Sequence, residues 1–241
     1  MGVAVPAFTP TSISGLQLWL DASDSSTLYQ NSNGTTAATA DGDPVGYWAD
    51  KSGNGRHATQ SDGTKKAALK VSNQNGRNVN YFDGVNDNLG FSFPISYGYV
   101  WVVYKFTGVT NSASAALINR SLGPGLYATM NFDTKPGIYW YKAGAGSDET
   151  MSLSVGTGTS SANVVRFILL QNEMGISLNE TTKSTVSLAS SPVGNWINIG
   201  SALTAQAYQG SICEIVVSTN AATDSDFTNM YLYLKQKWGT T

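Results

Sequence analysis

The chain has 241 residues, of which 41% are hydrophobic and only 12% are charged, and its formal net charge is −2. This length and apolar fraction are sufficient for one large hydrophobic core, whereas the charged fraction is about half that of an average globular protein. The near-neutral balance offers no basic face for nucleic acid, and no apolar run approaches the roughly 18 residues of a membrane span.

The N-terminal residues 1–13 are predicted to form an arm, because Pro6 and Pro10 interrupt regular structure there. The same stretch lacks a cationic region followed by an apolar core, so no secretory signal is expected and synthesis in the cytosol is predicted. The single Cys213 has no cysteine to pair with and is interpreted as a buried strand residue. Residues 14–241 contain no linker or internal repeat and are predicted to form one domain.

Short strands separated by turn residues follow the arm. Residues 15–20 alternate in polarity and predict a strand, and residues 21–78 are rich in Gly, Asn, Ser and Thr, which indicates long loops with short strands. The clearest strand is 99–106, and because both of its faces are largely apolar we expect it in the centre of a sheet. About a dozen strands, with turn signals every 8–15 residues or so, predict an all-β sandwich or jelly roll.

One amphipathic helix is predicted after a strand at 210–218. Its apolar residues recur at helical spacing, namely Phe227, Met230, Tyr231, Leu234 and Trp238. Thr223 with Asp226 has the spacing of a capping box, and Gly239 is suited to end the helix.

Four segments of the sequence occur in a recognisable order. They are SGLQLWLDAS at 14–23, WADKSGNGRHAT at 48–59, NGRNVNYFDGVND at 75–87, and the strand and helix that end at Trp238-Gly239. In these segments the chain resembles the concanavalin A-like lectin/glucanase superfamily, in the laminin-G-like branch found in bacteriophage virion and bacterial surface proteins. The resemblance implies a jelly-roll β-sandwich of two antiparallel sheets with one C-terminal α-helix.

The resemblance also implies a function. It favours a non-catalytic lectin-like module that binds carbohydrate on a cell surface or is displayed on a phage particle. A structural or decorating virion protein that uses the fold for subunit contacts is the alternative, and a glycoside hydrolase or lyase is a more remote one. The implied partners are a glycan and phage capsid or tail proteins, with the chain as a homo-oligomer or bound to a particle. The implied location is a virion or an extracellular surface.

Aromatic residues are the best candidates for a sugar-binding face, because sugars stack on Trp and Tyr rings. Tyr99 and Trp101 share one face of the predicted strand 99–106, and Tyr139 and Tyr141 share one face of another strand. An exposed face of this kind is a platform for a glycan. A face covered by loops or by a neighbouring subunit is the other interpretation.

The acidic residues argue against an enzyme. A retaining glycosidase needs two carboxylates about 5–5.5 Å apart in the cleft, but Glu214 has Ile212 and Val216 as its same-face neighbours. Glu214 is predicted to pair with Arg166 or Lys105 as a satisfied polar group. Arg166 is in addition the polar candidate for ligand binding. Catalysis is not expected.

No cofactor is predicted to be required. The single His57 has no nitrogen or sulfur partners for zinc. Relatives implied by the resemblance often hold calcium at the rim of the sandwich, and Asp83 and Asp87 are the first ligands to test here.

Asp21 and Asp24, three residues apart, are expected on opposite faces of a strand.

Overall fold

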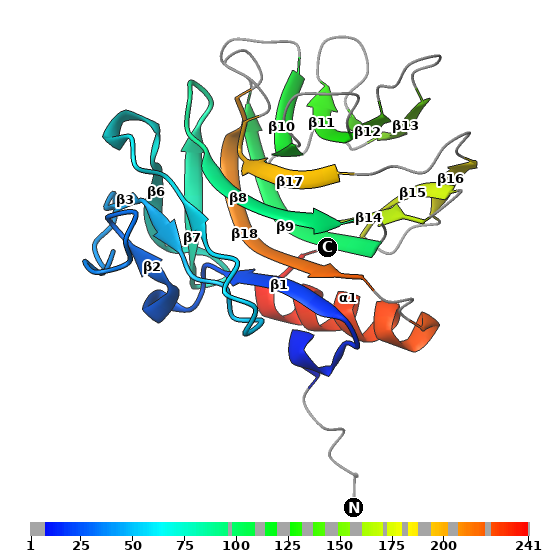
Figure 1. The fold of residues 1–241 in the computed structure, drawn as a ribbon, viewed down its shortest axis with the longest axis horizontal. Helices are drawn as coiled ribbons and strands as arrows, with labels where there is room; N and C mark the ends of the chain where they lie inside the picture. The colour runs from blue at the N-terminus through cyan, green and yellow to red at the C-terminus, as the bar shows by residue number, and fades with distance from the viewer. Residues whose placement is uncertain are drawn as a thin grey trace, which may run out of the picture.

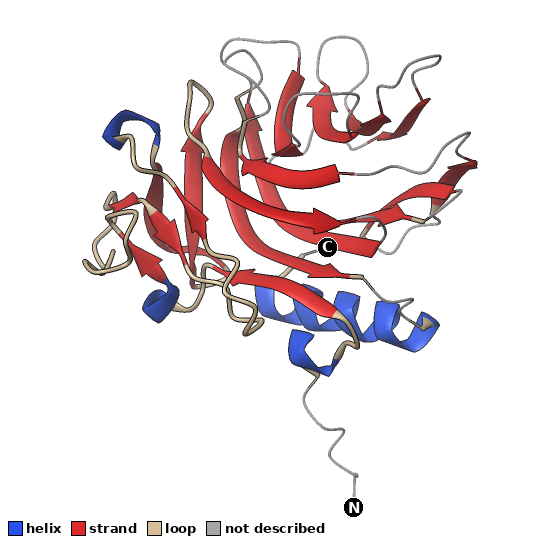
Figure 2. Ribbon diagram, viewed as in Figure 1, coloured by secondary structure: helices blue, strands red, loops and turns tan. Residues whose placement is uncertain are grey.

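A computed structural model describes residues 8–95, 98–108, 114–119, 126–131, 137–142, 149–154, 161–170, 173–179, 183–187, 194–201, 207–219 and 223–240. These residues form two antiparallel sheets, and one α-helix lies along the outer face of the first sheet (Figures 1 and 2). The predicted jelly-roll sandwich with a C-terminal helix is confirmed. No helix of the described residues is long and apolar enough to cross a membrane.

The first sheet carries the helix. Its strands, in spatial order, are β16 (Ser184–Ser187), β15 (Glu173–Leu178), β14 (Asn163–Leu169), β9 (Gly98–Gly108), β18 (Gln209–Ser218), β7 (Arg77–Asp83), β6 (Ala67–Gln74) and β3 (Pro44–Val45), and β1 (Leu16–Asp21) also pairs with β18. The apolar β9 lies between β14 and β18, so its predicted central place is confirmed.

The second sheet contains β13 (Glu149–Ser154), β12 (Gly137–Lys142), β11 (Leu126–Asn131), β10 (Ser114–Asn119), β17 (Gly194–Ile199), β8 (Leu89–Ile95), β5 (Ala58–Thr59), β4 (Tyr47–Trp48) and β2 (Leu28–Tyr29), in this order. Three short 3-10 helices, η1 (Pro10–Ser12), η2 (Ser25–Thr27) and η3 (Gly63–Lys65), lie in the connections. The predicted succession of loops and short strands over 21–78 is confirmed.

Strand β18, near the end of the described chain, pairs with strands from its first third. Its first half pairs with β7, where Ile212 lies opposite Asn80. Its second half pairs with β1, where Glu214 lies opposite Asp21. Strands β1 and β18 are therefore neighbours in the sheet, although their residues lie almost two hundred positions apart in the sequence.

The buried side chains form two layers. Between the sheets lie Trp48 and Phe82, both without exposed surface. Trp19 belongs instead to the second layer, between the first sheet and the helix. Cys213 is fully buried in this layer as predicted, and burial raises the pKa of its thiol.

The helix α1 (Asp224–Trp238) closes the outer face of the first sheet. Thr223 and Asp226 make the predicted capping box, and Gly239 ends the helix in the left-handed conformation with φ of 64°. The apolar stripe faces the sheet, with Met230, Leu234 and Trp238 fully buried. Most of the stability of such a short helix comes from this packing rather than from its intrinsic propensity.

Candidate functional site

Tyr99 and Trp101 do not form an open binding face. Their exposed fractions are 6% and 1%, and their rings contact Phe227 of α1 at centroid distances of 4.8 and 6.1 Å. The prediction that they stack on a glycan is wrong, because the apolar strand face that carries them is the one that the helix covers.

The other predicted ligand residues have different surroundings. The guanidinium carbon of Arg166 lies 4.5 Å from the ring centroid of Phe227, so this half-buried side chain belongs to the layer under the helix. Tyr139 and Tyr141 lie two positions apart on β12, which pairs with β11 and β13. Their side chains lie outside the described part of the chain, so their role as sugar platforms stays a prediction.

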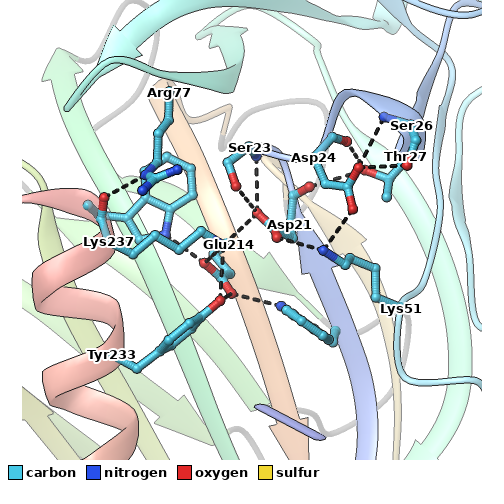
Figure 3. A network of polar contacts seen from close by, with 12 residues as sticks. Asp21, Ser23, Asp24, Ser26, Thr27, Lys51, Arg77, Glu214, Tyr233 and Lys237 are labelled. Atoms are coloured by element: carbon cyan, nitrogen blue, oxygen red, sulfur yellow. Dashed lines mark hydrogen bonds and ion pairs between the residues drawn. The ribbon is translucent and has the colours of Figure 1, made fainter. Parts of the chain in front are cut away.

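Glu214 is the centre of a polar network under the last turns of α1 (Figure 3). Its Oε1 accepts hydrogen bonds from Trp19 Nε1 at 2.7 Å and from Tyr233 OH at 3.0 Å. Its Oε2 accepts from Trp238 Nε1 at 2.6 Å and pairs with Lys237 Nζ at 2.8 Å. A carboxylate offers about four acceptor positions, so these donors occupy the group completely.

The predicted pairing of Glu214 with Arg166 or Lys105 is wrong. Lys105 lies opposite Ser211, and the register shift between Ile212 and Glu214 leaves Glu214 opposite Val103. The carboxylate faces the helix, where Lys237 supplies the cation.

Lys237 links Glu214 to a second carboxylate. Its Nζ lies 2.7 Å from Asp21 Oδ1, and Lys51 Nζ lies 2.9 Å from Asp21 Oδ2 and 2.8 Å from Asp24 Oδ2. The expectation that Asp21 and Asp24 lie on opposite faces is wrong, because β1 ends at Asp21. The chain then turns into η2, where the Asp24 side chain accepts a hydrogen bond from Ser26.

The two buried carboxyl groups differ in acidity. Burial alone would raise the pKa of Asp21, but Lys237, Ser23 and Lys51 outweigh it and hold this pKa below its usual value. Burial and the neighbouring Asp21 raise the pKa of Glu214 against the opposing effect of Lys237. Both groups are committed to hydrogen bonds and ion pairs within the protein, and the network is a structural clamp between helix and sheet.

A cleft of about 900 Å³ opens beside this clamp. It is lined by Phe8 and Thr9, Trp19, Asp21, the loop residues Ser23, Asp24 and Ser25, Lys51, Arg77, and the helix residues Asn229, Leu232, Tyr233, Gln236 and Lys237. Sequence reasoning missed this site because its lining comes from separate segments. The one available signal was the polar spacing of Asn229, Tyr233 and Gln236 on the outer side of the predicted helix.

Three polar side chains in the cleft have hydrogen-bonding capacity left over. The exposed amides of Asn229 and Gln236 have no hydrogen-bond partner within the described residues. Arg77 donates from Nε to the carbonyl of Lys237 at 2.8 Å, and its two Nη groups have no partner there. The ring of Tyr233 is fixed beside them, because its hydroxyl is bonded to Glu214. The cleft therefore combines aromatic surface with available donors and acceptors.

Asp83 and Asp87, the predicted calcium ligands, lie together where β7 ends, Asp83 as its last residue and Asp87 in the turn that follows. Asp87 is buried and accepts a hydrogen bond at Oδ2 from the Asp83 backbone N–H at 2.9 Å. Burial and the Asp83 carboxylate raise the pKa of Asp87 from its ordinary 3.8 to about 7. Calcium takes about six to eight oxygen ligands, but no group of three or more His, Cys, Asp or Glu side chains gathers within the described ranges. Calcium binding therefore stays a prediction, which a Ca²⁺ titration of the thermal midpoint tests.

Replacing Asp87 by Asn should change the pH dependence of stability. A carboxyl whose folded pKa lies above its unfolded pKa stabilises at low pH and loses that contribution as the pH rises, here between about 4 and 7. The loss is at most about 4 kcal/mol for a shift of this size. Asn keeps the acceptor for Asp83 but does not ionise, so urea unfolding should show the variant gaining stability over the wild type from pH 5 to pH 8. The exposed control Asp41→Asn should show no such gain.

The comparisons with known proteins concern the fold. No family model matches the sequence, and no curated protein matches it either. The chain aligns over 90% of its length with 98% of domain 4 of an extracellular arabinanase from Geobacillus stearothermophilus, solved in complex with arabinotriose, at a TM-score of 0.55 and 13% identity. It aligns over 95% of its length with 34% of a sialidase from Trypanosoma rangeli, at a TM-score of 0.59 and 13% identity.

A third match is an arabinofuranosidase solved with arabinofuranosyl-alpha-1,2-xylobiose. The alignment covers 79% of this chain and 50% of the arabinofuranosidase, at a TM-score of 0.58 and 13% identity. The chain spans about a third of the sialidase and half of the arabinofuranosidase. At these identities the likeness shows a shared β-sandwich fold and does not transfer an activity.

Proposed function

We propose that this protein is a non-catalytic carbohydrate-binding module and that the cleft beside α1 is its binding site. The observation that carries the proposal is the pairing, in one cleft, of a fixed Tyr233 ring with the unpartnered amides of Asn229 and Gln236. Sugars are bound in this way, with a ring against the apolar face and amides on the hydroxyl groups. The match to a whole domain that was solved with arabinotriose supports the same class of ligand.

The absence of catalysis is part of the proposal. The carboxylates at the cleft are Asp21 and Asp24, and both are bound by Lys51 at 2.8 to 2.9 Å. Glu214 lies behind the wall of the cleft with no exposed side-chain surface. A hydrolase needs one carboxyl group that protonates the leaving oxygen and a second that faces the sugar, and these groups are committed to the clamp.

The test is calorimetric titration and a glycan array with the full chain. We expect micromolar to millimolar binding of an oligosaccharide, weakened about tenfold or more by the double substitution Asn229→Ala and Gln236→Ala. The matched control Thr228→Ala, on the same helix outside the cleft lining, should bind as the wild type does. Loss of binding on Tyr139→Ala alone would move the site to β12, and an array without any hit would overturn the proposal.

We further propose that the module is displayed on a phage particle or a bacterial surface. The sequence resemblance supports this location. Its rival is a decorating virion protein whose aromatic surface is used for subunit contacts. Light scattering and fractionation of native particles separate the two. A monomer that binds sugar supports the module, whereas particle-bound chains without sugar affinity support the decorating role.

A further inference from the structure

The three cationic side chains of the cleft differ in whether a carboxylate of the protein is paired with them. Lys51 is held by Asp21 and Asp24, and Lys237 is held by Asp21 and Glu214. Both lysines are therefore paired with carboxylates within the protein. Within the described residues, Arg77 is the cleft cation that takes part in no ion pair.

Arg77 is fixed by the helix. Its Nε donates to the carbonyl of Lys237 in the last turn of α1, which restrains the guanidinium while both Nη groups keep their hydrogens available. In Figure 3, Arg77 lies over this last turn, and Asp24 lies together with Lys51 on the other side of Asp21. A ligand carboxylate at Arg77 would therefore be separated from the Asp24 carboxylate by the ion pairs of the clamp.

A restrained guanidinium with two available donors suits a planar anion. Arginine binds carboxylates through two parallel hydrogen bonds, which adds geometric specificity to the charge attraction. The amides of Asn229 and Gln236, which line the same cleft, suit hydroxyl groups, so the complementary ligand is an oligosaccharide that carries both carboxylate and hydroxyl groups.

We propose that the cleft selects acidic saccharides, those carrying a uronate or similar ring carboxylate, and that Arg77 is the residue that determines this preference. The inference rests on the proposed carbohydrate-binding function. It adds a ligand class and a specificity-determining residue to it.

The experiment compares ligands that differ in the carboxylate alone. Calorimetric titration of the full chain with trigalacturonate and with its methyl ester should show about tenfold or more tighter binding of the acid. Arg77→Gln should bring the two affinities within about twofold of each other, while binding of the ester stays as in the wild type. Arg77→Lys, which keeps the charge but loses the paired donors, should retain only part of the preference.

The control is Lys70→Gln, a partly exposed cation that is paired with Asp41 outside the cleft lining, and it should keep the full preference. Thermal midpoints of all variants verify that the fold is intact. Equal affinity of acid and ester in the wild type, or a preference that survives Arg77→Gln, overturns the inference and leaves the proposed function standing. Absence of binding to every saccharide tested overturns both.

Discussion

Replacing Lys237 by methionine should lower the free energy of unfolding by about 3–5 kcal/mol near pH 7. The substitution keeps the length of the side chain but removes the ammonium that lies 2.7 Å from Asp21 and 2.8 Å from Glu214. The fully buried Glu214 would then lose its cation, and Asp21 would keep Lys51 alone. Breaking a buried pair from one side costs far more than losing an exposed one.

The pH dependence of this variant gives a second readout. Burial and the neighbouring Asp21 already raise the pKa of Glu214, and without Lys237 nothing from the helix lysine opposes this rise. A raised carboxyl pKa favours the folded state at low pH, so the deficit relative to the wild type should shrink from about pH 7 to about pH 5. Guanidinium unfolding at both pH values measures it. Lys235→Met, an exposed lysine in the same turn, should cost less than about 1 kcal/mol, and an equal loss there would contradict the clamp.

Replacing Trp238 by alanine should cost about 3–5 kcal/mol or more, since this ring is fully buried between helix and sheet. The change also removes the Nε1 donor that holds Glu214 Oε2 at 2.6 Å. Trp238→Phe keeps most of the apolar surface and loses the donor, so it should cost about 1–3 kcal/mol. The difference between the two variants separates packing from hydrogen bonding.

Chemical denaturation followed by tryptophan fluorescence and far-ultraviolet circular dichroism measures both changes. Leu232→Ala is the matched control on the same helix, because that side chain is 53% exposed. Its effect should stay within about 0.5 kcal/mol. If Trp238→Ala were no more damaging than Leu232→Ala, the helix would not be an integral part of the fold.

The helix and the central strand could be predicted because their signals are local. The stripe from Phe227 to Trp238 specifies the buried side of α1, and the capping residues specify its ends. Strand β9 carries apolar residues on both faces, and such a strand must be covered on both sides. These patterns depend on sequence neighbours alone.

The site could not be predicted in the same way. Tyr99 and Trp101 satisfied the pattern of a sugar platform and equally that of a helix-covered face, and the local sequence does not say which element covers a strand. Glu214 was assigned a partner on neighbouring strands, whereas its cation comes from the helix and three of its donors are aromatic side chains. The cleft itself exists only once β1, α1 and the Lys51 loop meet.

The pairing of β1 with β18 also has a consequence during translation. Trp19 and Glu214 are separated by 195 positions, so at about 5–20 residues per second the ribosome needs roughly 10 to 40 seconds to supply the second partner after the first. For the later part of that interval the aromatic side of β9 is already synthesised and has no helix to cover it. We therefore expect nascent chains on one messenger to aggregate more readily than the finished protein. Co-expressed chaperones should improve the yield of folded protein more than stabilising substitutions do.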